Sequence, residues 1–119
     1  MLASGGGSIV NVGTTKTSPG TVGYAAAKTG LIGLALTVAA EYAKDNIRAN
    51  LLVVGGVDTP MYLQMNDTPE KRAGVAALHA QGRVAQPEEI ARTALYLLSD
   101  DASFVTGTQL SVEGGLSLV

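Results

Sequence analysis

Three short apolar runs, separated by longer stretches of helical composition, constrain the fold of this 119-residue chain more than any other feature. The runs are "SIVNV" at residues 8–12, "IRANLLVV" at Ile47–Val54 and "QLSV" at Gln109–Val112. Each has aliphatic or β-branched residues with glycine nearby, which is typical of a buried strand. Buried strands that alternate with helices need crossover connections, and these produce a parallel sheet covered on both faces. We therefore expect an α/β fold with three parallel strands and helices on both faces.

Three segments between these runs carry helix signals. Residues 21–44 have helical length and good helix formers, and this segment stops at an Asp-Asn pair. Residues 68–80 open with Thr-Pro and residues 86–98 open with Gln-Pro, and both pairs are typical of a helix cap followed by a first-turn proline. The predicted order is strand, helix, strand, two helices, strand.

Composition and charge narrow the class of protein. The chain has 46% apolar residues, which is enough for one domain with a buried core, so residues 1–119 are expected to form a single domain. A formal net charge of -2 creates no field strong enough to attract nucleic acid or acidic lipid. We therefore expect a small-molecule partner and neither nucleic acid nor membrane.

Neither a metal site nor a membrane span is expected. The absence of cysteine excludes disulfides and thiolate metal sites, and the single histidine, His79, which we place on a helix surface, cannot build a metal site alone. The longest apolar run, residues 30–40, is too short for a bilayer, and no basic, cleavable leader precedes it. These features predict a soluble, cytoplasmic protein. Asp100 and Asp101 are expected in a solvated turn.

The long helical segment is rich in small residues, including Gly30 and Gly33. A glycine inside a helix costs up to about 1 kcal/mol relative to alanine, so a close approach should compensate for it. Tight packing on the sheet is one explanation. Small residues lie on more than one side of the helix, so a second helix from another subunit is equally consistent with the pattern.

Tyr24 and Lys28 begin this helix at a spacing of four residues, which puts both side chains on one face. A lysine ammonium beside a phenol stabilises the phenolate, and this favours proton transfer near neutral pH. The alternative is a surface lysine beside a half-buried tyrosine.

Several ordered segments together resemble the C-terminal half of the short-chain dehydrogenase/reductase family: "GSIVNVG", "YAAAK", "IRANLLVVGGVDTPM", "RVAQPEEIA" and "SFVTGTQLSVEGG". The resemblance implies a partial Rossmann-like, doubly wound fold and an NAD- or NADP-dependent interconversion of a carbonyl and an alcohol. It also implies that Tyr24 donates or accepts the proton, and that Lys28 assists Tyr24 and holds the nicotinamide ribose.

The resemblance extends to further site residues. The family serine that orients the substrate oxygen aligns with Thr14, although the interval to Tyr24 is shorter than usual, and Thr15, Ser18 or an ordinary loop hydroxyl are alternatives. The family's Pro-Gly turn appears as Val54-Gly55, without the proline. In the "GVDT" segment, the backbone of Val57 and the hydroxyl of Thr59 would contact the nicotinamide carboxamide; the alternative for Thr59 is a helix cap before a proline. The nearby Met61, Tyr62 and Met65 belong either to packing or to a substrate lid.

The family's glycine-rich turn between a strand and a helix, which binds the dinucleotide pyrophosphate, has no counterpart in these 119 residues. We therefore expect this chain alone to bind NAD or NADP weakly or not at all. Its first strand would present an open edge, which predicts a homo-oligomer. The alternative function is a non-catalytic, self-associating module that has lost the cofactor site.

Overall fold

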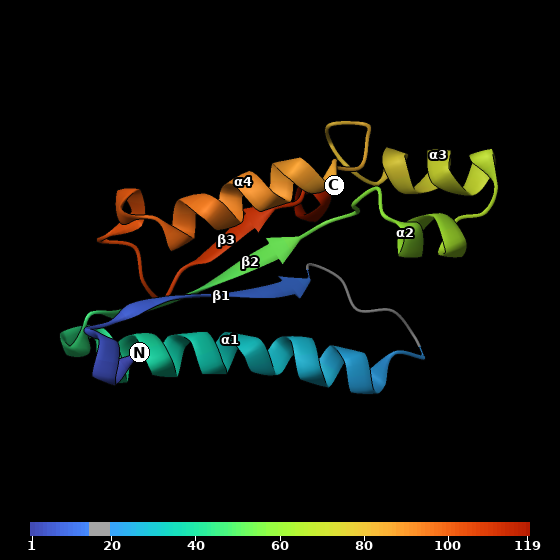
Figure 1. The fold of residues 1–119 in the computed structure, drawn as a ribbon. Helices are drawn as coiled ribbons and strands as arrows, with labels where there is room; N and C mark the ends of the chain where they lie inside the picture. Colours follow the sequence, from blue (N-terminus) through green and yellow to red (C-terminus); the bar gives the residue numbers. More distant parts are fainter. Residues whose placement is uncertain (15–19) are drawn as a thin grey trace.

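A parallel three-stranded sheet forms the centre of the molecule (Figure 1). The computed structural model describes residues 1–14 and 20–119. Strands β1 (Gly7–Thr14), β2 (Ile47–Val54) and β3 (Gln109–Val112) lie in the order β1-β2-β3. In register, Gly7 faces Ile47 and Thr14 faces Val54, so β1 and β2 end together. The three predicted strands are confirmed, with β1 extended at both ends.

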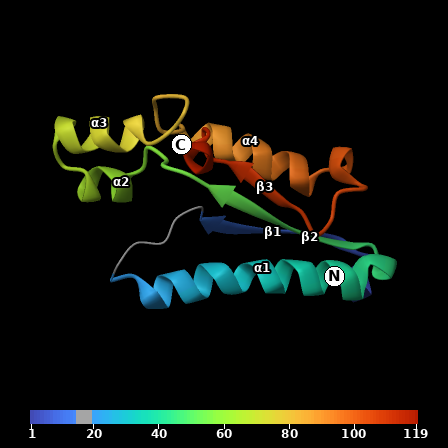
Figure 2. The same cartoon turned by 180° about the vertical axis from the view of Figure 1, so that it is seen from behind.

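Helices cover both faces of the sheet. Figures 1 and 2 show α1 (Val22–Tyr42) along one face and α4 (Pro87–Leu98) along the other. The short helices α2 (Pro60–Met65) and α3 (Pro69–Ala77) lie beyond the carboxyl end of β2. Four 3-10 turns complete the described chain: η1 (Leu2–Ser4), η2 (Ala43–Asp45), η3 (Asp100–Ala102) and η4 (Leu116–Leu118). The predicted α/β fold with helices on both faces is confirmed.

The helix ends follow the local chemistry that predicted them. The Thr68 hydroxyl accepts a hydrogen bond from the Lys71 N–H at 3.3 Å and begins α3. Gln86 and Glu89 form a reciprocal capping box at the start of α4. After α1 and the turn η2, Asn46 takes a left-handed conformation with φ of 57°, and the chain turns there into β2.

The core lies between α4 and the sheet. Leu52 of β2, Leu97 of α4 and Ala102 are fully buried there. Two polar residues of β2 fasten this layer. Arg48 donates to the carbonyls of the last turn of α4 and of the chain that follows it, and the buried Asn50 donates to one backbone carbonyl at 2.9 Å and accepts from one N–H at 3.1 Å ahead of β3. Buried polar groups with such partners hold neighbouring segments in place.

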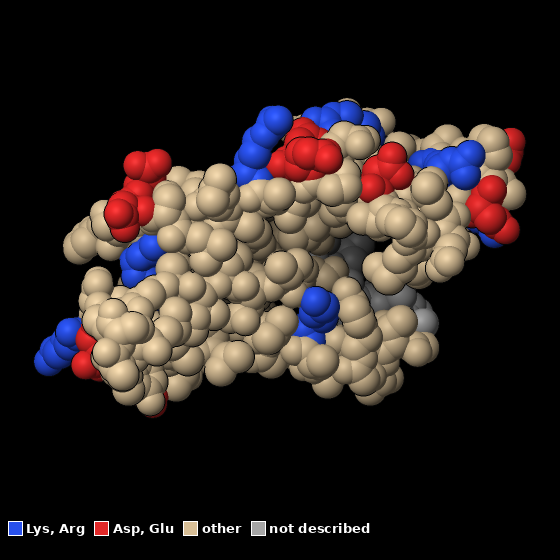
Figure 3. Space-filling model, viewed as in Figure 1, with Lys and Arg blue, Asp and Glu red and all other residues tan. Residues whose placement is uncertain are grey.

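Most of α1 is exposed on the side away from the sheet. Only Ala35 and Ala39 of this helix are buried, whereas Leu34 and Leu36 are 52% and 46% exposed. In Figure 3, the surface over α1 is largely uncharged, and acidic and basic groups gather over α4 and the α2–α3 end. By length and composition alone, the 24-residue stretch Val22–Asp45 is apolar enough to cross a membrane. The expectation that no segment is long enough considered only residues 30–40, and the helix extends beyond them. One such helix is weak evidence of a span, because core helices of soluble proteins meet the same criterion.

One expectation of the sequence is wrong. His79 was placed on a helix surface, but α3 ends at Ala77 rather than near residue 80, and the His79 side chain is buried. The chain turns after α3, and this turn directs the imidazole towards the end of the sheet. Asp100 and Asp101 are exposed, as expected, within the short turn η3.

Candidate active site

All six residues singled out in the sequence line one cavity of about 640 Å³: Thr14, Tyr24, Lys28, Gly55, Val57 and Thr59. The cavity lies at the carboxyl ends of β1 and β2, where the first turns of α1 also arrive. Ligands of open α/β sheets bind at this edge, because the loops that leave the strands converge there. The structure thus brings together residues from three separate segments of the sequence.

Tyr24 and Lys28 occupy the α1 side of the cavity. The Lys28 Nζ lies 5.8 Å from the centre of the Tyr24 ring, within reach of a cation–π interaction. The same Nζ donates a hydrogen bond to the Val12 carbonyl at 2.7 Å. The tyrosine is 52% exposed, so its phenol is accessible from the cavity and from solvent.

Thr14 lies at the mouth of the cavity as the last residue of β1. Its role as the hydroxyl that orients the substrate oxygen stays a prediction. The alternative hydroxyls, Thr15 and Ser18, lie outside the described residues.

The turn after β2 forms the floor of the cavity. Val57 makes an isolated parallel bridge with Ala85, in which the Ala85 N–H donates to the Gly56 carbonyl and the Asp58 N–H donates to the Ala85 carbonyl, both at 2.9 Å. In a parallel bridge with this pattern, the N–H and C=O of the central residue point away from the partner. The Val57 N–H is therefore directed away from Ala85.

Thr59 begins α2, a helix that sequence analysis did not predict. Its hydroxyl accepts from the Tyr62 N–H at 3.2 Å, so the alternative of a helix cap before Pro60 is confirmed. The Thr-Pro signal was the same as at the start of α3, and it could have identified this helix. The hydroxyl also donates to the Val57 carbonyl at 3.4 Å.

The two methionines of α2 form an apolar outer wall. Met61 and Met65 line the cavity and are 69% and 71% exposed, so they are not packing residues of the core. Tyr62 also lines the cavity. Their function as a substrate lid stays a prediction.

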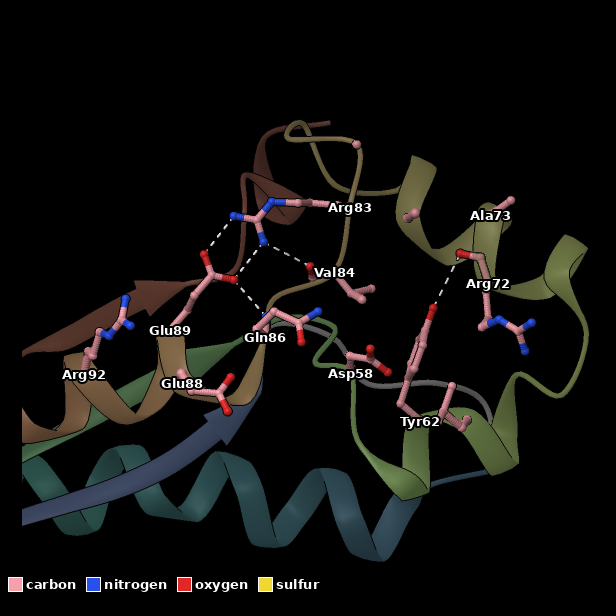
Figure 4. Close-up of a pocket in the computed structure, with 13 residues that line it drawn as sticks. Asp58, Tyr62, Arg72, Ala73, Arg83, Val84, Gln86, Glu88, Glu89 and Arg92 are labelled. Atoms are coloured by element: carbon pink, nitrogen blue, oxygen red, sulfur yellow. Dashed lines mark hydrogen bonds and ion pairs between the residues drawn. The ribbon is translucent and has the colours of Figure 1, made fainter.

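A second cleft, of about 990 Å³, lies between α3, the 82–86 loop and α4 (Figure 4). It is larger, but none of the six predicted site residues lines it. Its wall is fixed by a bidentate ion pair in which the Arg83 guanidinium donates to both Glu89 oxygens at 2.7 Å. This hydrogen bond, followed by one from the Gln86 N–H, lowers the pKa of Glu89 to about 2.

No cluster of three or more histidine or carboxylate side chains able to hold a metal ion is found within residues 1–14 and 20–119.

Comparison with known proteins identifies the family. A family model described as enoyl-(acyl carrier protein) reductase matches residues 1–117. The chain is 40% identical to the 3-oxoacyl-[acyl-carrier-protein] reductase of Chlamydia trachomatis, over 98% of this chain and 48% of that protein. The chain belongs to the short-chain dehydrogenase/reductase family. A second relative in this family, the cyclohexanol dehydrogenase of an Acinetobacter species, is 44% identical over 96% of this chain and 45% of its own length.

Solved structures of the family share the fold. A putative NAD(P)-dependent gluconate 5-dehydrogenase from Beutenbergia cavernae, with bound NADP, superposes with a TM-score of 0.92 at 34% identity. The match covers 100% of this chain and 49% of that one. The chain thus has a Rossmann-like short-chain dehydrogenase/reductase fold and spans about half the length of the relatives it matches.

Proposed function

We propose that this chain supplies the proton-transfer and nicotinamide-binding part of an NAD- or NADP-dependent oxidoreductase that interconverts a carbonyl and an alcohol. The observation that carries the proposal is the convergence of Tyr24, Lys28, Thr14 and the turn after β2 around one cavity. Family membership supports the reaction class, and the NADP-bound relative supports the choice of cofactor class.

Each side chain has a separate role in the proposed reaction. When bound, the nicotinamide supplies or accepts the hydride. Tyr24 Oη gives its proton to the carbonyl oxygen during reduction and takes it back during oxidation. The Lys28 ammonium stabilises the phenolate that forms in between, and the Thr14 hydroxyl orients the substrate oxygen.

The described residues fit the nicotinamide end of a dinucleotide. The Val57 N–H, directed away from Ala85, is suited to the carboxamide oxygen, and the Lys28 ammonium is suited to the ribose hydroxyls. The Thr59 hydroxyl already accepts from Tyr62 and donates to Val57, so it has one remaining lone pair for the carboxamide N–H. Gly55 also lines the cavity, and a Cβ there would lie 3.0 Å from the Glu113 backbone and from the His79 Nε2, so the turn can follow this path only with a glycine at that position.

The walls of the cavity favour an uncharged, largely apolar substrate. Among the described residues that line it, Lys28 alone carries a charge, and Met61, Met65 and Ile90 form an apolar side. The proposal assigns Lys28 to the nicotinamide ribose and the phenolate, so no other charged side chain among these described residues would compensate an ionised substrate group. A cyclic secondary alcohol or its ketone fits this chemistry, and one relative is named for cyclohexanol.

We further propose that residues 1–119 act as a single domain within a cytoplasmic homo-oligomer. The exposed apolar side of α1 and the position of β1 at an edge of the described sheet support self-association.

Replacement of Tyr24 by phenylalanine tests the chemistry. Tyr24→Phe removes only the phenol oxygen, so the fold should persist while cyclohexanone reduction by NAD(P)H falls by about 10²-fold or more. Initial rates and circular dichroism measure the two effects. Tyr96→Phe on α4, outside the cavity, is the matched control and should retain the wild-type rate. Equal turnover in wild type and Tyr24→Phe would remove Tyr24 from the mechanism and favour a non-catalytic, self-associating module.

A further inference from the structure

The single histidine of the chain is buried against the turn that follows β2, and the chemistry proposed above gives it no part. His79 is 4% exposed. Its Nε2 lies 3.0 Å from the backbone nitrogen of Gly56, and its Nδ1 lies 2.9 Å from the carbonyl oxygen of Val75 in α3. The imidazole therefore connects the last turn of α3 with the residue that precedes Val57.

The two partners determine where the ring carries its proton. A backbone N–H can only donate and a backbone carbonyl can only accept. His79 must therefore be neutral, with the hydrogen on Nδ1 and the lone pair of Nε2 accepting from Gly56. A hydrogen on Nε2 would oppose the Gly56 N–H and break this contact.

Two consecutive glycines make room for the ring. A Cβ on Gly55 would lie 3.0 Å from the Nε2 of His79 and equally close to the Glu113 backbone. A Cβ on Gly56 would lie 2.8 Å from the Cγ1 of Val84 and 3.0 Å from the Cε1 of His79. Glycine pairs also leave the backbone with little intrinsic restriction. The preceding position is Val54, where the family turn has a proline, so no ring restrains the chain there either. The turn must therefore be held by contacts from other segments.

His79 holds a peptide of this turn that the Ala85 bridge does not reach. The bridge fixes the Gly56 carbonyl and the Asp58 N–H, both at 2.9 Å. The N–H of the peptide between Gly55 and Gly56 bonds to His79 instead. The backbone of residues 55–59 accepts or donates one hydrogen bond with a side chain from another segment, among residues 1–14 and 20–119, and that side chain is His79.

We propose that His79 is a positioning residue for the nicotinamide-binding turn. Peptide planes are rigid, so fixing the Gly55–Gly56 plane through His79 and the Gly56–Val57 plane through Ala85 sets the direction of the Val57 N–H. The cavity then presents a donor ready for a carboxamide, with little ordering left to do on binding. What the turn binds rests on the proposed function. The hydrogen bond between His79 and Gly56, which tethers the turn, follows from the ring geometry alone.

The protonation of the ring gives a direct test without any substitution. Because the sequence has one histidine, ¹⁵N-labelling of histidine yields a single imidazole spin system. Long-range ¹H–¹⁵N spectra of the wild-type protein at neutral pH should show the hydrogen on Nδ1 and an unprotonated Nε2. A ring with its hydrogen on Nε2 would overturn the proposal.

Two amide variants separate the two ends of the ring. In His79→Gln, the side-chain oxygen reaches the place of Nε2 and can still accept from Gly56. In His79→Asn, the shorter amide reaches only the place of Nδ1, so it keeps the donor towards Val75 and loses the acceptor. We expect the Gly56 amide hydrogen to exchange about tenfold faster in His79→Asn and near the wild-type rate in His79→Gln.

Binding of nicotinamide mononucleotide, followed by amide chemical shifts, extends the test to the ligand. Its dissociation constant should rise about fivefold or more in His79→Asn and recover in His79→Gln. Two results would show that His79 only ends a helix. One is a Gly56 exchange rate that is unchanged in His79→Asn. The other is an equal loss of exchange protection in both variants that is confined to the amides of α3. No binding by the wild type would overturn the nicotinamide assignment, and the exchange rates would then decide the tether separately.

Discussion

At the scale of single residues, the position of the Lys28 ammonium depends on a strand as well as on its own helix. Nζ donates to the Val12 carbonyl at 2.7 Å while it lies 5.8 Å from the centre of the Tyr24 ring. Val12 is two residues before Thr14, so one hydrogen bond relates the cation to the strand end that carries the Thr14 hydroxyl. A free lysine side chain has considerable rotamer entropy, and this tether removes part of it before a ligand binds. The pair is thus preorganised by tertiary structure.

The sequence predicted which residues would meet but not how the buried polar residues hold them. A spacing of four residues and the order of segments were enough to bring Tyr24, Lys28 and Thr14 to one cavity. Their roles stay predictions. His79 was assigned wrongly because its partner, Gly56, is 23 positions away in the chain and is a backbone group that any residue type offers. Asn50 was missed for the same reason, since its partners are also backbone groups of a distant segment.

At the scale of elements, the stability that the Arg83–Glu89 pair gives to the start of α4 is predicted to depend on pH. The bond from Arg83, and then that from the Gln86 N–H, lower the Glu89 pKa from 4.5 to about 2. A depressed carboxyl pKa contributes stability above the unfolded value, and that contribution is lost as pH falls through the folded value. Glu89→Gln should therefore lower the melting temperature at pH 7, and its deficit should shrink between about pH 4.5 and pH 2.

Calorimetric melting of wild type and Glu89→Gln across this range measures the effect. The glutamine oxygen can still accept from Gln86, so the variant isolates the charge from the cap. Glu88→Gln, at the neighbouring exposed position of the same helix turn, is the control, because it removes one negative charge from the helix start and leaves the Arg83–Glu89 pair intact. A deficit that stays constant with pH would mean that the Arg83 pair adds nothing to the folded state.

Element boundaries followed local signals where those signals were strong. β2 and β3 begin and end as predicted, because apolar runs flanked by glycine or a turn leave little choice of register. β1 is longer than its apolar run, since Gly7 and Thr14 also find partners in β2. The helix α2 was missed because six residues are too few for a periodic pattern, and only its Thr-Pro start marked it.

At the scale of the whole molecule, the exposed side of α1 is predicted to join two copies. Leu34 is 52% exposed on this helix, in a surface that carries little charge (Figure 3). A charge buried in an apolar interface is costly, so Leu34→Glu should convert an oligomer into a monomer in light scattering. Leu95→Glu, at a 66% exposed position on α4, is the control and should leave the assembly intact. A monodisperse wild-type monomer at high concentration would contradict the prediction.

A whole dinucleotide needs a site for its adenosine and pyrophosphate as well as one for its nicotinamide. In the family, the adenosine and pyrophosphate are held by a glycine-rich strand-turn-helix, and these 119 residues carry no such sequence. On this chain, the proposed site would contact only the nicotinamide-ribose end of the dinucleotide, through Tyr24, Lys28, Val57 and Thr59. A few hydrogen bonds of about 1 kcal/mol each do not offset the several kcal/mol lost when a flexible dinucleotide is immobilised.

The 119-residue chain by itself should therefore bind NAD(H) or NADP(H) no more tightly than about millimolar. Calorimetric titration with each dinucleotide measures this affinity, and nicotinamide mononucleotide is the matched ligand, because it lacks the adenosine half. The two ligands should bind with similar affinity, since the additional half finds no partner on this chain. A micromolar affinity for either dinucleotide would show that the chain forms a pyrophosphate site of its own, for instance where two copies meet along the edge of β1.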